Sequence, residues 1–321
     1  MNYESFLALL KEELKSYLEK DNNDSIISIK KVLKNNGIEL DALTLVSAGC
    51  SAAPTIYLNN YYTEYQEGRD IREIVEEIYE MIKKNSGRID FKLDDFMDFH
   101  KIKNRIVFKV VNADSNKKLL GMAPHIRKMD LAIVFYCVIQ CNTSENATTM
   151  IYNQHLEMWN VDLDTIYETA KNNTPVLLPW EIKSMADIIR EMIGEDEELV
   201  EECSYNGETI EDLTSHLMEE LTLAPDTPQM YVLTNKFRLN GAASMFYEGV
   251  LKKFAEEHDR DLIVLPSSVH EVILIPMEKD MLPEHFDHMV KEVNREEVEP
   301  SEILSNHAYV YKRDQDELLI R

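Results

Sequence analysis

The sequence predicts an α+β fold in which mixed or antiparallel sheets are built from hairpin–helix units, with one helical insertion. Three observations predict it. Short runs alternate apolar and polar residues, amphipathic helical patterns separate these runs, and turn residues such as Asn36-Gly37 stand where two runs meet. Hairpins that alternate with single helices favour antiparallel pairing over a doubly wound parallel sheet.

Residues 1–102 form the predicted N-terminal α-β-β-β-α unit. An apolar stripe over 3–20 indicates its first helix, and isoleucines over 71–82 indicate its last. Asn-Gly tolerates the positive φ values of a tight turn, so 26–46 is predicted to be a hairpin. The three strands are expected at 25–34, 38–47 and 54–58.

Residues 103–175 form the predicted central β-hairpin–helix unit, with Asp162 placed to cap its helix. Its strands are expected at 105–111, 130–140 and 148–152. Prolines then bracket residues 176–228, which are predicted to be an acidic helical linker or insertion with helices at 182–193 and 210–221.

Residues 229–321 form the predicted C-terminal β-α-β-β-α unit, either separate or continuous with 103–175. A helix is expected at 242–258, and a hairpin at 262–276 around Ser267 and Ser268. The remaining elements are a strand at 230–233, a helix at 284–294 and a terminal pair at 308–312 and 318–320.

Composition limits the classes of function. The 321 residues include 59 Asp and Glu against 34 Lys and Arg, a net charge of −25. This balance argues against direct binding to nucleic acid or to an anionic membrane. The four cysteines are too few and scattered for a disulfide framework, and no apolar run approaches the roughly 18 residues of a membrane span. A cytoplasmic protein with reduced thiols is expected.

Several segments carry a family resemblance: PTIYLNNYYTEYQEG (54–68), RIVFKVVN (105–112), MDLAIVFYCVI (129–139), MWNVDLDTIYETAKNNTP (158–175), MYVLTNKFRLNGAASMFY (230–247) and LIVLPSSVHEVILIP (262–276). In these segments, the chain resembles proteins of gut Clostridia and related Firmicutes that are known only as a domain of unknown function. The resemblance runs over almost the whole chain. It implies a bacterial cytoplasmic protein, but no activity, cofactor or catalytic residue.

One polar cluster has the residue types of a catalytic site: Ser267, Ser268, His270 and Glu271, set between two apolar runs. Nucleophilic catalysis needs a serine in contact with a histidine that a carboxylate orients. No Gly-x-Ser-x-Gly elbow surrounds these serines, so a hairpin turn is the simpler interpretation. With Asn235, the four residues remain candidates for a ligand site.

Other polar groups support weaker hypotheses. Residues 235–241 (NKFRLNG) precede a predicted helix whose free amides suit an anion, although Asn240 as an ordinary helix cap is the simpler interpretation. A second polar cluster comprises His125, Arg127 and Asp130, in which a structural Arg127–Asp130 pair is expected. No motif has the ligand spacing of a metal site, and no cofactor is predicted.

Three functions follow as hypotheses. The first is a binding or regulatory module with a protein partner, because no catalytic motif outweighs its structural interpretation. The second is a hydrolase-like enzyme or ligand-binding domain around Ser268 and His270. The third is an acidic inhibitor from a mobile element that mimics nucleic acid, for which the net charge is the only support.

Overall fold

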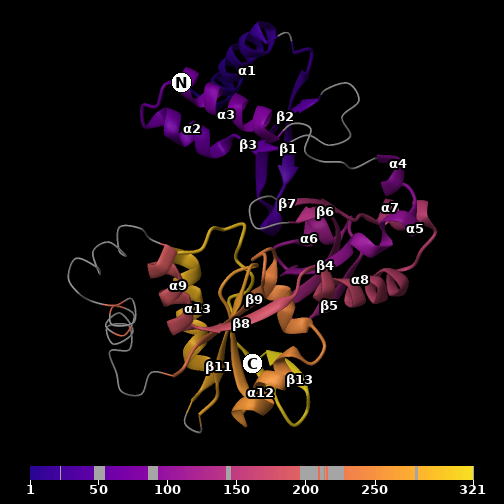
Figure 1. Cartoon of the computed structure of the whole chain (residues 1–321), viewed down its shortest axis with the longest axis vertical. Coiled ribbons are helices and arrows are strands. Elements are labelled where there is room, and N and C mark those ends of the chain that lie inside the picture. Colours follow the sequence, from indigo (N-terminus) through magenta and orange to yellow (C-terminus); the bar gives the residue numbers. More distant parts are fainter. Residues whose placement is uncertain are drawn as a thin grey trace.

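The chain is arranged in three tiers in the computed structural model, with the N-terminal unit at the top of Figure 1 and the C-terminal sheet at the bottom. The structure describes residues 1–21, 23–46, 55–85, 93–141, 146–195, 209, 213, 215, 228–278 and 281–320. These residues form an α+β fold whose paired strands are antiparallel, as the alternating hairpin and helix patterns predict.

The N-terminal unit has a hydrophobic core of its own. The apolar stripe of α1 buries Phe6, Leu10 and Leu14 against Ile74 and Ile78 of α3. Both predicted helices are confirmed, while α2 is an addition that the tyrosine-rich, weakly amphipathic sequence did not indicate. The elements are α1 (Tyr3–Lys20), β1 (Ile26–Leu33), η1 (Asn35–Gly37), β2 (Glu39–Val46), β3 (Ile56–Tyr57), α2 (Asn59–Gln66) and α3 (Ile71–Asn85).

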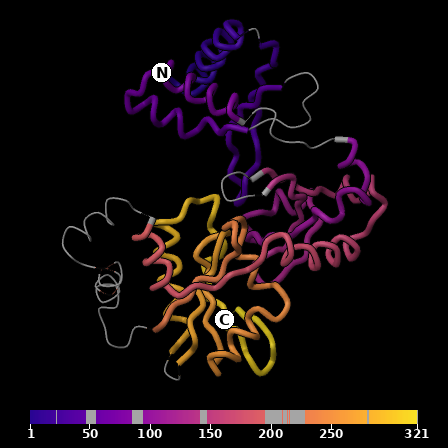
Figure 2. The backbone as a smooth tube through the Cα atoms, viewed as in Figure 1, coloured from indigo at the N-terminus to yellow at the C-terminus, as the bar shows by residue number. Residues whose placement is uncertain are grey.

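The predicted hairpin of β1 and β2 is confirmed, with Leu33 paired to Glu39 at its end. Asn36 and Gly37 have φ values of 60° and 73° at its tip. Glycine and asparagine adopt this left-handed region more readily than other residues do, which is why this dipeptide forms the turn. The hairpin extends from the N-terminal unit down to the central tier (Figure 2).

Asn36, at the hairpin tip, forms hydrogen bonds to two other parts of the chain. The Nδ2 atom of Asn36 donates to the carbonyl oxygens of Pro300 and Ile303, each at 2.8 Å. Its backbone N donates to Oδ1 of Asn116, whose Nδ2 donates back to Oδ1 of Asn36, both at 2.8 Å. Asn36 therefore joins the N-terminal unit to the central unit and to the loop before β12.

The central sheet is built around β6, the long apolar strand predicted at 130–140. β4 lies along one side of β6, and β5 and β7 follow one another along the other side. The short strand β5 and the helix α7 were not predicted, because each is a short segment in a polar connection. The elements are α4 (Leu93–Phe96), α5 (Phe99–Ile102), η2 (Lys103–Arg105), β4 (Ile106–Asn112), α6 (Lys117–Leu120), β5 (His125–Lys128), β6 (Leu131–Cys141), β7 (Asn146–Met150), α7 (Asn153–Trp159) and α8 (Leu163–Leu177).

The C-terminal sheet has the strand order β13-β12-β10-β11-β9-β8. The predicted hairpin at 262–276 is confirmed as β10 and β11, and the terminal pair as β12 and β13. The elements are β8 (Trp180–Ser184), α9 (Met185–Glu195), β9 (Tyr231–Asn235), η3 (Gly241–Phe246), α12 (Val250–His258), β10 (Leu262–Pro266), β11 (Val272–Pro276), α13 (Pro283–Glu296), β12 (Tyr309–Lys312) and β13 (Glu317–Ile320).

Two predicted helices in this part of the chain need correction. The helix expected at 182–193 begins at Met185, because 180–184 is a strand that pairs with β9 inside the range predicted as a helical insertion. The helix expected at 242–258 is split into η3 and α12, since Gly249 has a φ of 77° that breaks the helix. The helix expected at 210–221 lies outside the described residues, apart from isolated positions.

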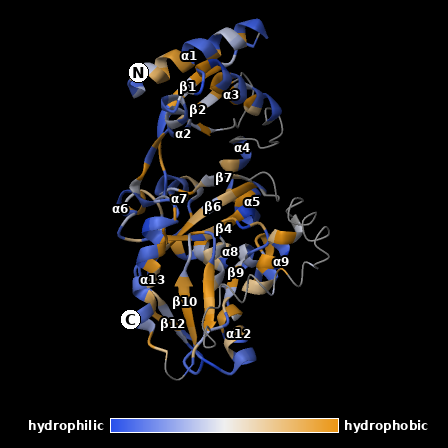
Figure 3. Cartoon of the chain, turned by 90° about the vertical axis from the view of Figure 1, so that its left-hand side faces the viewer, coloured by the Kyte–Doolittle hydropathy of each residue, from blue (hydrophilic) through white to orange (hydrophobic). Residues whose placement is uncertain are grey.

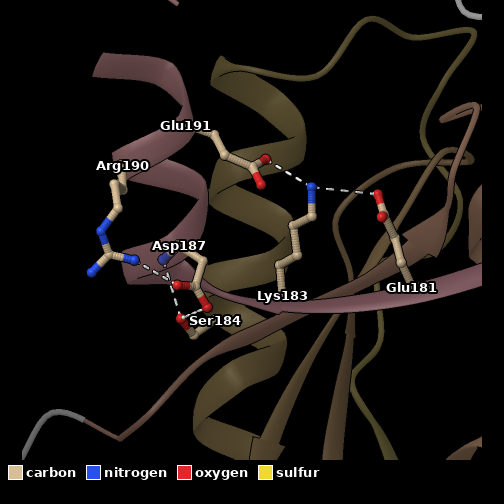
Figure 4. A network of polar contacts seen from close by, with 6 residues as sticks. All are labelled: Glu181, Lys183, Ser184, Asp187, Arg190 and Glu191. Carbon is tan, nitrogen blue, oxygen red and sulfur yellow. Dashed lines mark hydrogen bonds and ion pairs between the residues drawn. The ribbon is translucent and has the colours of Figure 1, made fainter. Parts of the chain in front are cut away.

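Polar contacts secure β8 to the helix that follows it (Figure 4). Lys183 on β8 pairs with Glu191 of α9 at 2.7 Å, and with Glu181 at 3.8 Å. The Oγ atom of Ser184 accepts a hydrogen bond from the backbone N of Asp187, which caps the first turn of α9. The short predicted linker helix is therefore anchored to the edge of the sheet.

One apolar cluster runs through the central and C-terminal tiers. It includes Phe108 and Phe135 of the central sheet, Val264 and Tyr309 of the C-terminal sheet, and Phe254 of α12. The helix α13 covers the opposite face of the C-terminal sheet, where Ile263 and Ile275 pack against Val290. In Figure 3, the apolar colouring lies along these strands, while the outer surfaces of the helices are hydrophilic.

We expect Asn36→Gly to destabilise the protein while keeping the turn. Glycine accepts the positive φ, but the side-chain bonds to Asn116, Pro300 and Ile303 are lost, which costs about 1–3 kcal/mol of unfolding free energy. Urea denaturation measures this loss, and small-angle scattering tests whether the radius of gyration increases. Asn160→Gly is the matched control, because exposed Asn160 also has positive φ, at a helix end. Equal stability of the two variants would mean that the side-chain hydrogen bonds of Asn36 do not stabilise the protein.

Candidate functional site

A cavity of about 450 Å³ lies where the three tiers meet. The end of β1 and its hairpin tip form one wall, the central sheet forms another, and loops of the C-terminal part close the third. We refer to it as the junction cavity. Its lining residues are Val32, Leu33, Lys34, Asn35, Tyr57, Lys109, Leu119, Tyr136, Thr148, Thr149, Met150, Tyr152, Leu239, Asn240, Val269, His270, Ser301 and Glu302.

Two lysines from different tiers line the junction cavity. Lys34 follows β1, and its Nζ lies 4.1 Å from the centre of the Tyr57 ring. Lys109 lies in β4, and its Nζ donates to Oδ1 of Asn35 at 3.2 Å. Within the described part of the chain, no ion pair joins either amine to a carboxylate. The cavity therefore carries positive charge that its own walls do not pair.

Strand geometry explains the position of Lys109. Side chains alternate along β4, so Phe108 and Val110 enter the shared core while Lys109 lies on the opposite face with Val107 and Val111. Those two valines belong to separate apolar clusters, and Lys109 stands between them. A lysine on an apolar sheet face is unusual, because burying an ammonium group without a partner costs free energy.

The surroundings of Lys109 shift its protonation. Burial, and then the positive charge of Lys34, lower the pKa of Lys109 from the ordinary 10.5 to about 8. A sizeable fraction of this amine is therefore neutral slightly above neutral pH. The sequence analysis missed Lys109, although a signal was present: a single lysine interrupts the buried strand IVFKVV.

His270, a candidate from the sequence, lines the junction cavity with a side chain that is 35% exposed. Its Nδ1 lies 2.9 Å from the carbonyl oxygen of Arg238 and 3.3 Å from the backbone N of Asn240. The shorter contact favours a proton on Nδ1, and this leaves Nε2 facing Glu302 Oε1 at 3.6 Å. His270 thus holds the 238–240 loop and presents its second nitrogen beside a carboxylate.

The two serines do not form a nucleophile–base pair with this histidine. The Oγ of Ser268 accepts from the backbone N of His270 at 3.0 Å, and the Oγ of Ser267 donates to Glu271 at 3.2 Å. These are turn contacts, and Ser268 N also donates to the carbonyl of Glu271 across the loop. None of Ser267, Ser268 and Glu271 lines the junction cavity.

Asn235 is fully buried and braces the loop that leads to the cavity. Its Oδ1 accepts from the backbone N of Phe237 and of Leu239, and its Nδ2 donates to the carbonyl of Leu239. The side chain is therefore occupied by the 237–239 backbone. Of the three residues expected at a ligand site, Asn235, Ser268 and His270, the one that lines the junction cavity is His270.

Gly241 sets the distance between this loop and the end of β9. A Cβ atom at this buried position would collide with Thr234 Oγ1 and with the carbonyl oxygen of His270. These two atoms are themselves hydrogen-bonded at 2.7 Å. Asn240 occupies the expected N-cap position before η3, but its side chain makes no capping hydrogen bond and its φ is 52°. Both Asn240 and His270 line the junction cavity because Gly241 allows this close packing.

The second polar cluster is divided between two structural roles. Arg127 ion-pairs with Asp114 at 3.6 Å, and Asp130 accepts hydrogen bonds from Ser305 at 2.6 Å and Tyr309 at 2.8 Å. The expected Arg127–Asp130 pair is therefore wrong. Asp130 instead ties the start of β6 to β12, and burial together with its negative charge raises the pKa of Tyr309. The ring of His125 contacts the carbonyl of Ala123.

The described residues offer little support for metal or thiol chemistry. Among them, no three His, Cys, Asp or Glu side chains gather closely enough to hold a metal ion, and no helix is long and apolar enough to cross a bilayer. Burial raises the pKa of the Cys137 thiol to about 11, so this thiol is poorly nucleophilic. The other three cysteines have no described side chains.

Comparisons with known proteins give one match. The model of a family of unknown function, DUF5688, matches residues 3–313, which is nearly the whole chain. Neither the curated proteins nor the solved structures gave a match.

We expect Lys109→Met to stabilise the protein below about pH 8, and this gain to disappear towards pH 10.5. The folded pKa of Lys109 lies below the unfolded one, so the unfolded chain binds more protons between these values. Wild-type stability therefore rises with pH in that window, whereas methionine has nothing to titrate. The other ionisable groups lining the cavity, common to both proteins, are Lys34, Tyr57, Tyr136, Tyr152, His270 and Glu302.

Urea denaturation at several pH values, with exposed Lys30→Met as the control, measures this difference. A gain that is independent of pH would show that Lys109 keeps an ordinary pKa.

We expect Gly241→Ala to destabilise the protein by about 1–3 kcal/mol, because a methyl group at this position has no space. Gly194→Ala is the matched control, since a Cβ there meets nothing within 4 Å. Thermal unfolding of the two variants compares them directly. A Gly241→Ala protein as stable as the control would mean that the 234–241 packing is loose.

Proposed function

The chain belongs to DUF5688, a family of unknown function, and we propose that it is a binding module whose junction cavity holds a small anionic molecule. The observation that carries this proposal is the pair Lys34 and Lys109. Both line the cavity, and neither is joined to a carboxylate by an ion pair within the described residues. The carboxylate among the lining residues, Glu302, faces His270 and is not ion-paired with either lysine.

The electrostatics support an anion as the missing partner. After burial, the charge of Lys34 lowers the pKa of Lys109, which means that the two cations repel one another across the cavity. An anionic group between them would relieve this repulsion and restore the proton on Lys109. Phosphate and carboxylate groups are the anions that lysine binds most often in proteins.

The rest of the lining suits a small organic molecule. Tyr57, Tyr136, Tyr152 and Met150 offer flat or flexible apolar surface, while Asn35 and Asn240 offer amide groups. A volume of about 450 Å³ lies within the range of ligand sites. Glu302 and His270 form a separate polar corner, which suits a hydrogen-bond donor on the ligand.

The position of the cavity gives binding a regulatory consequence. Lys34 comes from the N-terminal unit, and Lys109 from the central sheet, so a bound anion adds contacts across the same boundary as Asn36. Ligand binding would therefore favour the docked arrangement, in which the hairpin tip of the N-terminal unit contacts the central sheet. The protein partner expected from the sequence would bind this docked arrangement with a different affinity from one in which the hairpin tip has moved away.

Binding is tested with inorganic phosphate, pyrophosphate and a mononucleotide as probes, by calorimetry and thermal unfolding. We expect at least one probe to bind and raise the melting temperature, since a ligand at about 100 times its Kd contributes about 2.7 kcal/mol. Lys34→Met and Lys109→Met should each weaken binding by about tenfold or more, and added salt should weaken it further. Exposed Lys30→Met, on the same hairpin, should bind normally.

Equal binding by the wild type and by the Lys34→Met/Lys109→Met double variant would overturn this function. So would the failure of every anionic probe to bind the wild type.

A further inference from the structure

The surroundings of Lys109 differ from those that the binding of an anion alone would require. Lys109 lies on a sheet face between two valines of separate apolar clusters, lines the junction cavity, and its amine contacts only Asn35 among the hydrogen bonds described for it. Lys34, by contrast, lies over the Tyr57 ring, where an aromatic face stabilises a cation. The two lysines therefore differ in their contacts, and the surroundings of Lys109 favour its neutral amine.

A neutral lysine amine is a nucleophile. Proteins activate lysine by removing it from water or by placing another cation beside it, and both conditions hold for Lys109. The lowered pKa agrees with this geometry, since a sizeable fraction of the amine carries a free lone pair slightly above neutral pH. The amine also lines a cavity large enough to admit a reaction partner.

We propose that Lys109 forms an imine with the carbonyl group of a small anionic aldehyde or ketone bound in the junction cavity. This inference rests on the proposed function, because Lys34 supplies the charge that holds the anionic group. The anion beside Lys34 would orient the carbonyl towards Lys109 on the neighbouring wall.

The step needs no oxidant or other co-reactant. The lone pair of Nζ attacks the carbonyl carbon and forms a C–N bond, and the carbonyl oxygen takes up a proton to give a carbinolamine. The C–O bond then breaks, the C=N bond forms, and one water leaves. Its oxygen comes from the carbonyl group and its two hydrogens come from the amine.

The test uses pyridoxal 5′-phosphate as an anionic aldehyde probe and borohydride to reduce any imine to a stable amine. Peptide mapping by mass spectrometry then locates the adduct. We expect Lys109 to be labelled at least about tenfold faster than exposed lysines near pH 7.5, because its neutral fraction is much larger. Inorganic phosphate should protect Lys109, and pyridoxal without the phosphate should label it less.

Two matched variants complete the test. Lys109→Arg keeps the positive charge but forms no stable imine, so it should lose both the imine absorbance and the borohydride-stable adduct. Lys30→Arg, an exposed change, should leave Lys109 labelling intact. Labelling that is spread evenly over surface lysines and unaffected by Lys109→Arg would overturn the imine. If phosphate still bound through Lys34 in that case, the proposed function would stand without it.

Discussion

The hydrogen bonds of Asn36 join the N-terminal unit to the other two tiers, which share one apolar core. Its amide joins the N-terminal unit to Asn116 and to the carbonyls of Pro300 and Ile303, and its positive φ turns the hairpin tip so that these bonds form. The N-terminal core is otherwise separate from the cluster shared by the other two tiers. The junction cavity therefore depends on a small polar contact and not on a continuous apolar interface.

This dependence matters for the electrostatics of the cavity. Lys109 lies on a central-sheet face that would open to water if the hairpin tip moved away, and its pKa is lowered by burial and by Lys34. Docking of the N-terminal unit thus brings two like charges together in a partly buried space. The repulsion between these charges is unfavourable, and the proposed anion would relieve it.

The residues with the most familiar catalytic types, apart from His270, turned out to hold turns beside the site and not to line it. Ser267, Ser268 and Asn235 use their polar atoms on nearby backbone or on the turn itself. Short-range spacing predicted the hairpin around them, because turns and strands depend on local φ preferences and alternation. The same spacing says little about function, since a serine and a histidine two residues apart suit a turn as well as a catalytic pair.

The sequence by itself determined the α+β class, the two hairpins, the helices at either end of the N-terminal unit and the buried strand β6, since each follows from periodicity or turn chemistry within about 20 residues. It also placed His270 among apolar runs. Only the tertiary structure decided that His270, Lys34 and Lys109 share one cavity. Alternation puts Lys109 on one face of β4, but which element covers that face is set by contacts between residues far apart in the chain, such as Asn36 with Asn116. Such contacts depend on complementary shape and charge between folded units, which no local pattern encodes.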